Sequence, residues 1–225
     1  MPKRALIEKR PWLLASLVAG ISFFFVKDSH LPGLYQMAWK GAGVALLAVY
    51  ALVRHHGTDS RQIAGVMALG ALGDVLIEID MIYGALAFLA GHVLAIWLYA
   101  RHRRTSLSAS QRVLAILLVP LVVWIAWSLP ADPAQRPGIA LYATGLAIMA
   151  AMAWTSNFSR YRVGIGAMMF VVSDLLIFAR LGPLSTSALP GLLIWPLYYF
   201  GQFMICTGVI GELSSRATPG LGGRQ

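Results

Sequence analysis

Apolar side chains fill long, nearly uninterrupted stretches of the chain, with short polar or turn-rich breaks between them. A helix needs about 17 to 25 such residues to cross the roughly 30 Å hydrocarbon core of a bilayer. Eight stretches approach that length, at about 12–26, 37–53, 62–79, 81–100, 112–129, 137–154, 161–179 and 189–211. The pattern predicts an all-α, polytopic membrane protein. A single bundle of eight transmembrane helices would occupy residues 1–213, with a flexible C-terminal tail at 214–225.

Continuity of these stretches favours helices over a β-barrel, whose strands would alternate apolar and polar residues over segments of about ten residues. Hydrophobic residues make up 58% of the chain and charged residues 12%, and the mean hydropathy is +0.70, far from the balance of a soluble domain. Basic residues precede the first stretch, as in a secretory signal, but no small-residue cleavage site follows Phe25. We expect a retained helix.

The net charge of +9 is unevenly distributed over the connections. With a cytoplasmic N-terminus, the inside segments carry Lys3, Arg4, Lys9, Arg10, Arg54, Arg61, Arg101, Arg103, Arg104, Arg112, Arg160, Arg162, Arg216 and Arg224. The outside segments carry only Lys27, Arg136 and Arg180. This positive-inside pattern predicts an integral, multi-pass protein of a bacterial-type inner membrane, with both termini cytoplasmic. Membrane lipids are the expected partners of the basic excess, rather than nucleic acid.

Five ionisable side chains interrupt the apolar stretches: Lys40, Asp74, Glu78, His92 and Asp174. A charge inside a bilayer is unfavourable by at least ~3 kcal/mol near the centre, so such residues mark functional sites. At a rise of about 1.5 Å per residue, Asp74 and Asp174 both lie roughly 8 Å below the outer boundary. Lys40 lies slightly nearer the surface and His92 nearer the midplane. The sequence therefore predicts a polar cavity in one half of the bilayer.

Other polar side chains share that level. Tyr198 and Gln202 are four residues apart and so lie on one face of the last helix, and Tyr199 is one position round. Structural roles stay open for Lys40, which could reach the interface, and for His92. Glu78 suits a solvated mouth of the cavity. The remaining aromatic residues considered are interpreted as packing or interfacial side chains: Tyr142, Trp124, Trp127 and Trp154.

A weak internal similarity links the two halves of the chain. Gly-Asp at 73–74 returns as Ser-Asp at 173–174, and Gly-His at 91–92 is echoed by Gly-Gln at 201–202. Each half would contain four helices in the same orientation. The similarity indicates two parallel four-helix repeats.

In order and spacing, these residues resemble the YhhN family of integral membrane proteins. The likeness includes Lys40, residues 73–76, 91–92 and 173–176, and Tyr198, Tyr199 and Gln202, and it extends over nearly the whole chain. One departure is glycine after Lys40, where the resemblance would lead us to expect proline in many relatives. The resemblance implies eight transmembrane helices and a lysoplasmalogenase activity, which hydrolyses the vinyl ether bond of a lysophospholipid to a fatty aldehyde and a glycerophospho-base. It also implies that Asp74 and Asp174 are the essential pair.

Two buried carboxyl groups suit this chemistry. Vinyl ether hydrolysis begins with slow protonation of the β-carbon, and water then captures the oxocarbenium ion. A carboxyl group in apolar surroundings can keep its proton near neutral pH, and a second carboxylate can stabilise the cation and orient water. Asp174 is slightly preferred as the acid, because Lys40 and Glu78 lie in the half that holds Asp74. No metal or other cofactor is expected.

Supporting roles follow from the predicted depths. Lys40 would hold the lipid phosphate as a point charge and His92 would orient a carboxylate. Hydrogen bonds to water or the glycerol oxygens would come from Tyr198, Tyr199 and Gln202. No protein partner is predicted.

Three other classes of protein are compatible with parts of the sequence. In a proton-coupled transporter of a lipid or small molecule, Asp74, Asp174 and His92 would relay protons. A zinc-dependent membrane hydrolase is disfavoured, because the other histidines fall in loops and Cys206 is the only cysteine. A purely structural membrane protein is least favoured, since paired buried charges need an explanation.

Overall fold

A computed structural model describes residues 11–216, and this part of the chain is helical with no strand. Its α-helices are α2 (Pro11–Val26), α3 (Gly33–Arg54), α4 (Thr58–Leu76), α5 (Met81–Arg101), α6 (Ala109–Ser128), α7 (Arg136–Thr155), α8 (Ile165–Ala179) and α9 (Leu189–Arg216). A 3-10 turn, η1 (Pro133–Gln135), precedes α7, and a π-helical turn, η2 (Arg160–Gly164), precedes α8. The all-α prediction is confirmed, and each expected apolar stretch falls on one of these helices.

Six helical segments are long and apolar enough to cross a bilayer: Gly33–Arg54, Met81–Arg101, Ala109–Ser128, Pro133–Thr155, Arg160–Ala179 and Leu189–Arg216. Helix α2 is apolar but has 16 residues. Helix α4 has 19 residues, three of them charged: Asp59, Arg61 and Asp74. The chain is a multi-pass membrane protein.

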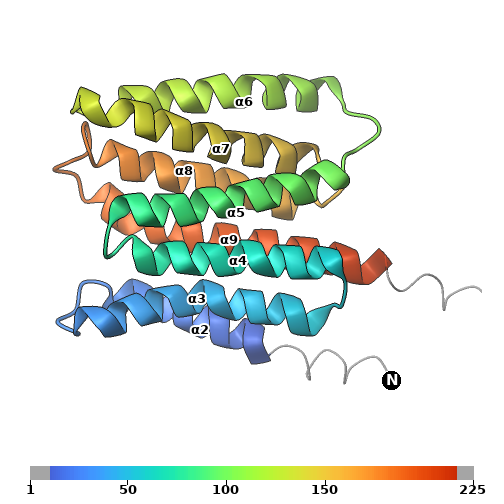
Figure 1. Cartoon of the computed structure of the whole chain (residues 1–225), viewed down its shortest axis with the longest axis horizontal. Coiled ribbons are helices and arrows are strands. Elements are labelled where there is room, and N and C mark those ends of the chain that lie inside the picture. The colour runs from blue at the N-terminus through green and yellow to red at the C-terminus, as the bar shows by residue number, and fades with distance from the viewer. Residues whose placement is uncertain (1–10, 217–225) are drawn as a thin grey trace, which may run out of the picture.

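Neighbouring helices lie side by side and successive helices run in opposite directions (Figure 1). Helix α9 packs against α2, α3, α4 and α8, which places it in the interior of the bundle. Helix α6 lies at one edge, and its principal contacts are with α7. The connections after α3, α5 and α7 share one end of the bundle with both ends of the described chain, at the right of Figure 1.

Glycines bring α8 and α9 together. A Cβ atom at Gly166 would lie 2.7 Å from the carbonyl oxygen of Gly201, and one at Gly201 would lie 2.8 Å from the carbonyl oxygen of Gly166. Such distances leave no room for a side chain, so the two backbones touch here. This contact fixes the position of Asp174 on α8 relative to Tyr198 and Gln202 on α9.

Several helix ends differ from the expected apolar stretches: α3, α4 and α6 begin three or four residues earlier, and α4 and α9 end elsewhere. Helix α4 stops at Leu76, and residues 77–79 form a turn, so Glu78 lies beyond the helix rather than on the face of Asp74. The helix ends here because the side chain of Asp80 caps α5 by accepting hydrogen bonds from the N–H groups of Ile82 and Tyr83. At the other end of the chain, α9 continues to Arg216, three residues past the predicted end of the bundle at residue 213. Residues 217–225, the rest of the predicted tail, lie outside the described part.

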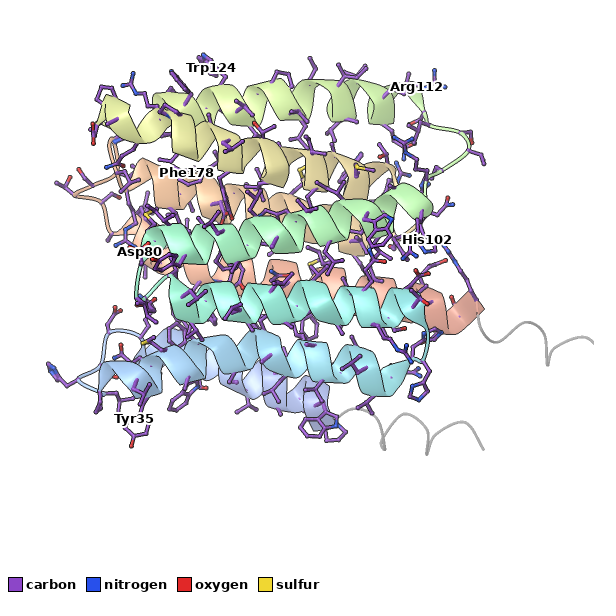
Figure 2. All side chains as sticks on the ribbon, viewed as in Figure 1. Tyr35, Asp80, His102, Arg112, Trp124 and Phe178 are labelled. Atoms are coloured by element: carbon purple, nitrogen blue, oxygen red, sulfur yellow. The ribbon has the colours of Figure 1, made fainter. Side chains whose placement is uncertain are left out.

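Basic side chains gather at the end of the bundle where the chain enters and leaves. Figure 2 shows His102 and Arg112 at this end and Asp80 and Trp124 at the opposite end. Asp59 there accepts hydrogen bonds from Arg101 at 2.6 Å and pairs with His102 at 2.8 Å. The predicted inside cations Lys3, Arg4, Lys9, Arg10 and Arg224 lie outside the described residues.

Candidate active site

Asp74 and Asp174 lie toward the same end of the bundle. Asp74 is two residues before the end of α4, and Asp174 is five residues before the end of α8. Figure 2 shows Phe178, one turn after Asp174, and Asp80, just after α4, in the same half of the molecule. Both aspartates are almost fully buried, with exposures of 2% and 4%. Their charges are close enough to interact.

A tyrosine from the central helix binds Asp74. The Tyr198 hydroxyl donates a hydrogen bond of 2.7 Å to Oδ2 of Asp74, and it lies 3.5 Å from the carbonyl oxygen of Gly70. Gln202, one turn later on α9, also interacts with this hydroxyl. Tyr198 therefore contacts Asp74 directly, and Gln202 contacts the hydroxyl of Tyr198.

Asp174 is bound by a tyrosine that the sequence analysis assigned to packing. The hydroxyl of Tyr142 on α7 donates a 2.7 Å hydrogen bond to Oδ2 of Asp174. Nε2 of His92 lies 3.2 Å from the same hydroxyl, and its ring contacts Tyr142 and Phe170 edge to face. Tyr142 packs against His92 and Phe178, as interpreted, but packing is not its whole role, because its hydroxyl also binds Asp174. The sequence held a signal for this role, namely the depth of Tyr142 in the membrane. Tyr142 lies near the start of α7, at the same end of the bundle as the aspartates and at about their level.

Lys40 and Glu78 form an ion pair. Nζ of Lys40 lies 2.5 Å from Oε1 of Glu78, and the side chains are 17% and 47% exposed. Both charges act on Asp74. The sequence left two roles open for Lys40, one at the membrane interface and one in the site. Both are compatible with the structure, because the Lys40 ammonium lies at the edge of the site.

Tyr199 faces away from the aspartates. Its hydroxyl lies 2.9 Å from Oγ of Ser16, which donates to the carbonyl oxygen of Gly43 at 2.6 Å. Tyr199 thus ties α9 to α2 and α3. Its neighbour Trp195 donates a 2.7 Å hydrogen bond from its indole nitrogen to the carbonyl oxygen of Gly20.

Two hollows lie near the aspartates, and neither aspartate is among their lining residues. A cavity of about 10 Å³, lined by His92, Gln202 and Phe170 among others, is comparable with the space of one water molecule. A cleft of about 450 Å³ opens at the end of the bundle, with Lys40, Glu78 and Trp195 among its lining residues. Within residues 11–216 no three His, Cys, Asp or Glu side chains are grouped as a metal site.

Comparison with known proteins places this arrangement in a family. The YhhN family profile matches residues 35–209, a range that includes both aspartates, both tyrosines that bind them, and His92. The chain belongs to the YhhN family. Lysoplasmalogenase TMEM86B of Sus scrofa is 30% identical over 187 residues, which cover 77% of each chain.

Bacterial relatives align over a similar length of this YhhN chain. The lysoplasmalogenase of Mycobacterium bovis is 27% identical over 192 residues, covering 80% of this chain and 73% of the relative. The lysoplasmalogenase of Mycobacterium tuberculosis has the same identity and coverage. No solved structure matches the chain.

Proposed function

We propose that this protein is a membrane-embedded lysoplasmalogenase that hydrolyses the vinyl ether bond of a lysophospholipid by acid–base catalysis with Asp74 and Asp174. The observation that carries the proposal is the pair of buried aspartates, each bound by a tyrosine hydroxyl at 2.7 Å. The names of the similar proteins supply the substrate class. No metal or cofactor is needed for this chemistry.

Protonated Asp174 gives its proton to the β-carbon of the vinyl ether, which leaves an oxocarbenium ion. Asp74 as carboxylate stabilises the cation and takes a proton from the water that adds to the α-carbon. In the second half, Asp74 returns that proton to the departing glycerol oxygen, and Asp174 accepts the hemiacetal hydroxyl proton. The carbon–oxygen bond breaks, the aldehyde leaves, and both carboxyl groups regain their starting protonation states.

The assignment of Asp174 as the acid has support from its neighbours. Asp174, Tyr142 and Nε2 of His92 form a chain of groups that can exchange protons. Asp74 instead accepts a hydrogen bond from Tyr198 and lies near the Lys40–Glu78 ion pair, whose opposite charges act on it in opposite senses. His92 and Tyr142 therefore serve the acid, and Lys40, Tyr198 and Gln202 serve its partner.

The membrane arrangement is part of the proposal. Helices α2 and α4 alternate in direction with the six longer segments, which supports eight crossings with both termini on the basic side. The aspartates occupy the third helix of each half, α4 and α8, as expected for two parallel repeats. The catalytic half of the bundle would then face away from the cytoplasm.

Substitution of the two aspartates tests the proposal. Asp74→Asn and Asp174→Asn keep the side-chain volume but remove the acid and base, so aldehyde release from lysoplasmalogen should fall about a thousandfold in each. Asp132→Asn is the matched control, because Asp132 only caps η1 at the same end of the bundle. Wild-type rates in either buried variant would disprove the two-carboxylate mechanism. Transport of lipid into proteoliposomes without aldehyde release would instead indicate that the protein is a proton-coupled transporter.

A further inference from the structure

Besides Lys40, the 450 Å³ cleft carries four charged groups that the catalytic cycle does not use: Lys27, Asp28, Glu78 and Arg180. Its walls come from the connection between α2 and α3, the first turns of α3, the turn after α4, and the connection between α8 and α9. Its volume falls in the range of about 300 to 1,000 Å³ that is usual for small-molecule sites. Three cations and two carboxylates line it: Lys27, Lys40, Arg180, Asp28 and Glu78.

Pairing among these groups leaves one cation over. Lys27 lies 2.8 Å from Oδ2 of Asp28, and Lys40 lies 2.5 Å from Oε1 of Glu78. Arg180 forms no ion pair with any residue in the described part of the chain. Its planar guanidinium can bind two oxygens of one phosphate. Carboxylate oxygens remain available to a ligand, since Glu78 is 47% exposed and Asp28 is 84% exposed.

The inner wall of the cleft adjoins the aspartate site. Lys40 lines the cleft and its charge acts on Asp74. Trp195 also lines the cleft, and its ring centroid lies 5.7 Å from that of Tyr198, which donates to Asp74. A ligand in the cleft is thus separated from Asp74 by one layer of side chains.

We propose that this cleft binds the zwitterionic phosphate–amine headgroup of the lipid substrate. Arg180 and Lys40 bind the phosphodiester oxygens, and Glu78 and Asp28 face the ammonium group. The excess cation selects a phosphate, and the carboxylates select a headgroup that also carries a positive charge. This inference rests on the proposed function, because it takes the substrate to be a lysophospholipid.

Arg180→Gln tests the cleft by two independent measurements. Calorimetry on the full-length protein in detergent measures binding of glycerophosphoethanolamine, which has the headgroup but no vinyl ether. Kinetics compare an alkenyl glycerophosphoethanolamine with an alkenyl glycerol that lacks the phosphate. The matched control is Arg54→Gln, an exposed arginine at the opposite end of the bundle.

Loss of a hydrogen-bonded charge should weaken binding of glycerophosphoethanolamine about tenfold in Arg180→Gln. The ratio of kcat/KM for the phosphate-bearing substrate to that for the phosphate-free one should also fall about tenfold, with Arg54→Gln within about twofold of wild type. Unchanged binding and an unchanged ratio in Arg180→Gln would overturn the proposal. Inorganic phosphate that binds as tightly as glycerophosphoethanolamine would overturn it too, because the cleft would then be a simple anion site.

The two measurements separate this inference from the proposed hydrolase. Wild-type protein that binds glycerophosphoethanolamine through Arg180 but releases no aldehyde would support the headgroup cleft and refute the hydrolase. Aldehyde release with no dependence on Arg180 in either measurement would refute the cleft alone.

Discussion

Asp74 and Asp174 have matching positions on α4 and α8 but different neighbours. Each accepts a hydrogen bond from one tyrosine, yet only the tyrosine at Asp174 also contacts a histidine. A hydroxyl between a carboxyl and an imidazole can orient both and pass a proton between them. At the level of single residues, Tyr142 therefore distinguishes the two aspartates.

Tyr142→Phe removes this hydroxyl and keeps the ring that packs edge to face against Phe178 and His92. Asp174 becomes a carboxylate as it gives up its proton, and a hydrogen bond to a charged group contributes about 1.5 to 3 kcal/mol, so kcat for aldehyde release should fall about 10- to 100-fold. The melting temperature should fall only modestly, because the buried carboxyl of Asp174 loses one partner while the ring packing remains.

Tyr99→Phe is the control for this prediction. Tyr99 is fully buried, and its hydroxyl has no hydrogen-bond partner among the described residues. Its removal should leave kcat within about twofold of wild type, because no paired group loses a partner. Equal losses of activity in Tyr99→Phe and Tyr142→Phe would contradict a specific role for Tyr142.

The depth of a side chain in the membrane was predictable from the sequence, but the direction in which the side chain points was not. Depth along an apolar helix follows from counting, and it pointed to Asp74, Asp174 and His92. Whether Tyr198 or Tyr199 faces Asp74 depends on the rotation of α9, which its contacts with four other helices decide. The sequence could only place both near the site; the structure directs Tyr199 to Ser16 instead.

Helices were predicted well because their apolar stretches are long, whereas their ends were predicted less well. The apolar residues Ile77 and Ile79 extend the hydropathy signal past Leu76, although the backbone has already turned there. At the far end, residues 212–216, four of which are polar, continue α9 beyond the apolar stretch. Hydropathy reports burial in lipid, and a helix end is set by backbone hydrogen bonds and caps.

The contact between α8 and α9 gives a prediction at the level of elements. Gly201→Ala would place a Cβ atom 2.8 Å from the carbonyl oxygen of Gly166. Backbone must move to relieve this overlap, so the free energy of unfolding should fall by about 1 to 3 kcal/mol. Activity should also fall, because Asp174 shifts relative to α9. Thermal unfolding in detergent, with aldehyde release measured on the same samples, checks both effects.

Gly138→Ala is the matched control on α7, where a Cβ atom would have no neighbour within 4 Å. Alanine favours a helix over glycine by up to about 1 kcal/mol, so this variant should be as stable as wild type or slightly more stable. A Gly201→Ala protein that unfolds at the wild-type temperature would show that α8 and α9 do not depend on this close approach.

At the scale of the whole molecule, the candidate site and the basic connections lie at opposite ends of the bundle. The aspartates and the cleft lie toward one end, and the basic connections after α3, α5 and α7 lie at the other. If the basic end is cytoplasmic, the headgroup cleft opens on the outer side of the membrane. Lysophospholipid would then be taken from the outer leaflet.

Cysteine labelling tests this orientation. Cys206 is the only cysteine and is fully buried, so a thiol reagent should label the protein very little before a second cysteine is introduced. Thr186→Cys, between α8 and α9, should react with a membrane-impermeant maleimide on intact cells. Ser106→Cys, between α5 and α6, should react only after the membrane is permeabilised. The opposite labelling pattern would mean that the bundle is inverted and that the cleft opens to the cytoplasm. Labelling of both sites on intact cells would contradict a bundle in which these two connections lie on opposite sides of the membrane.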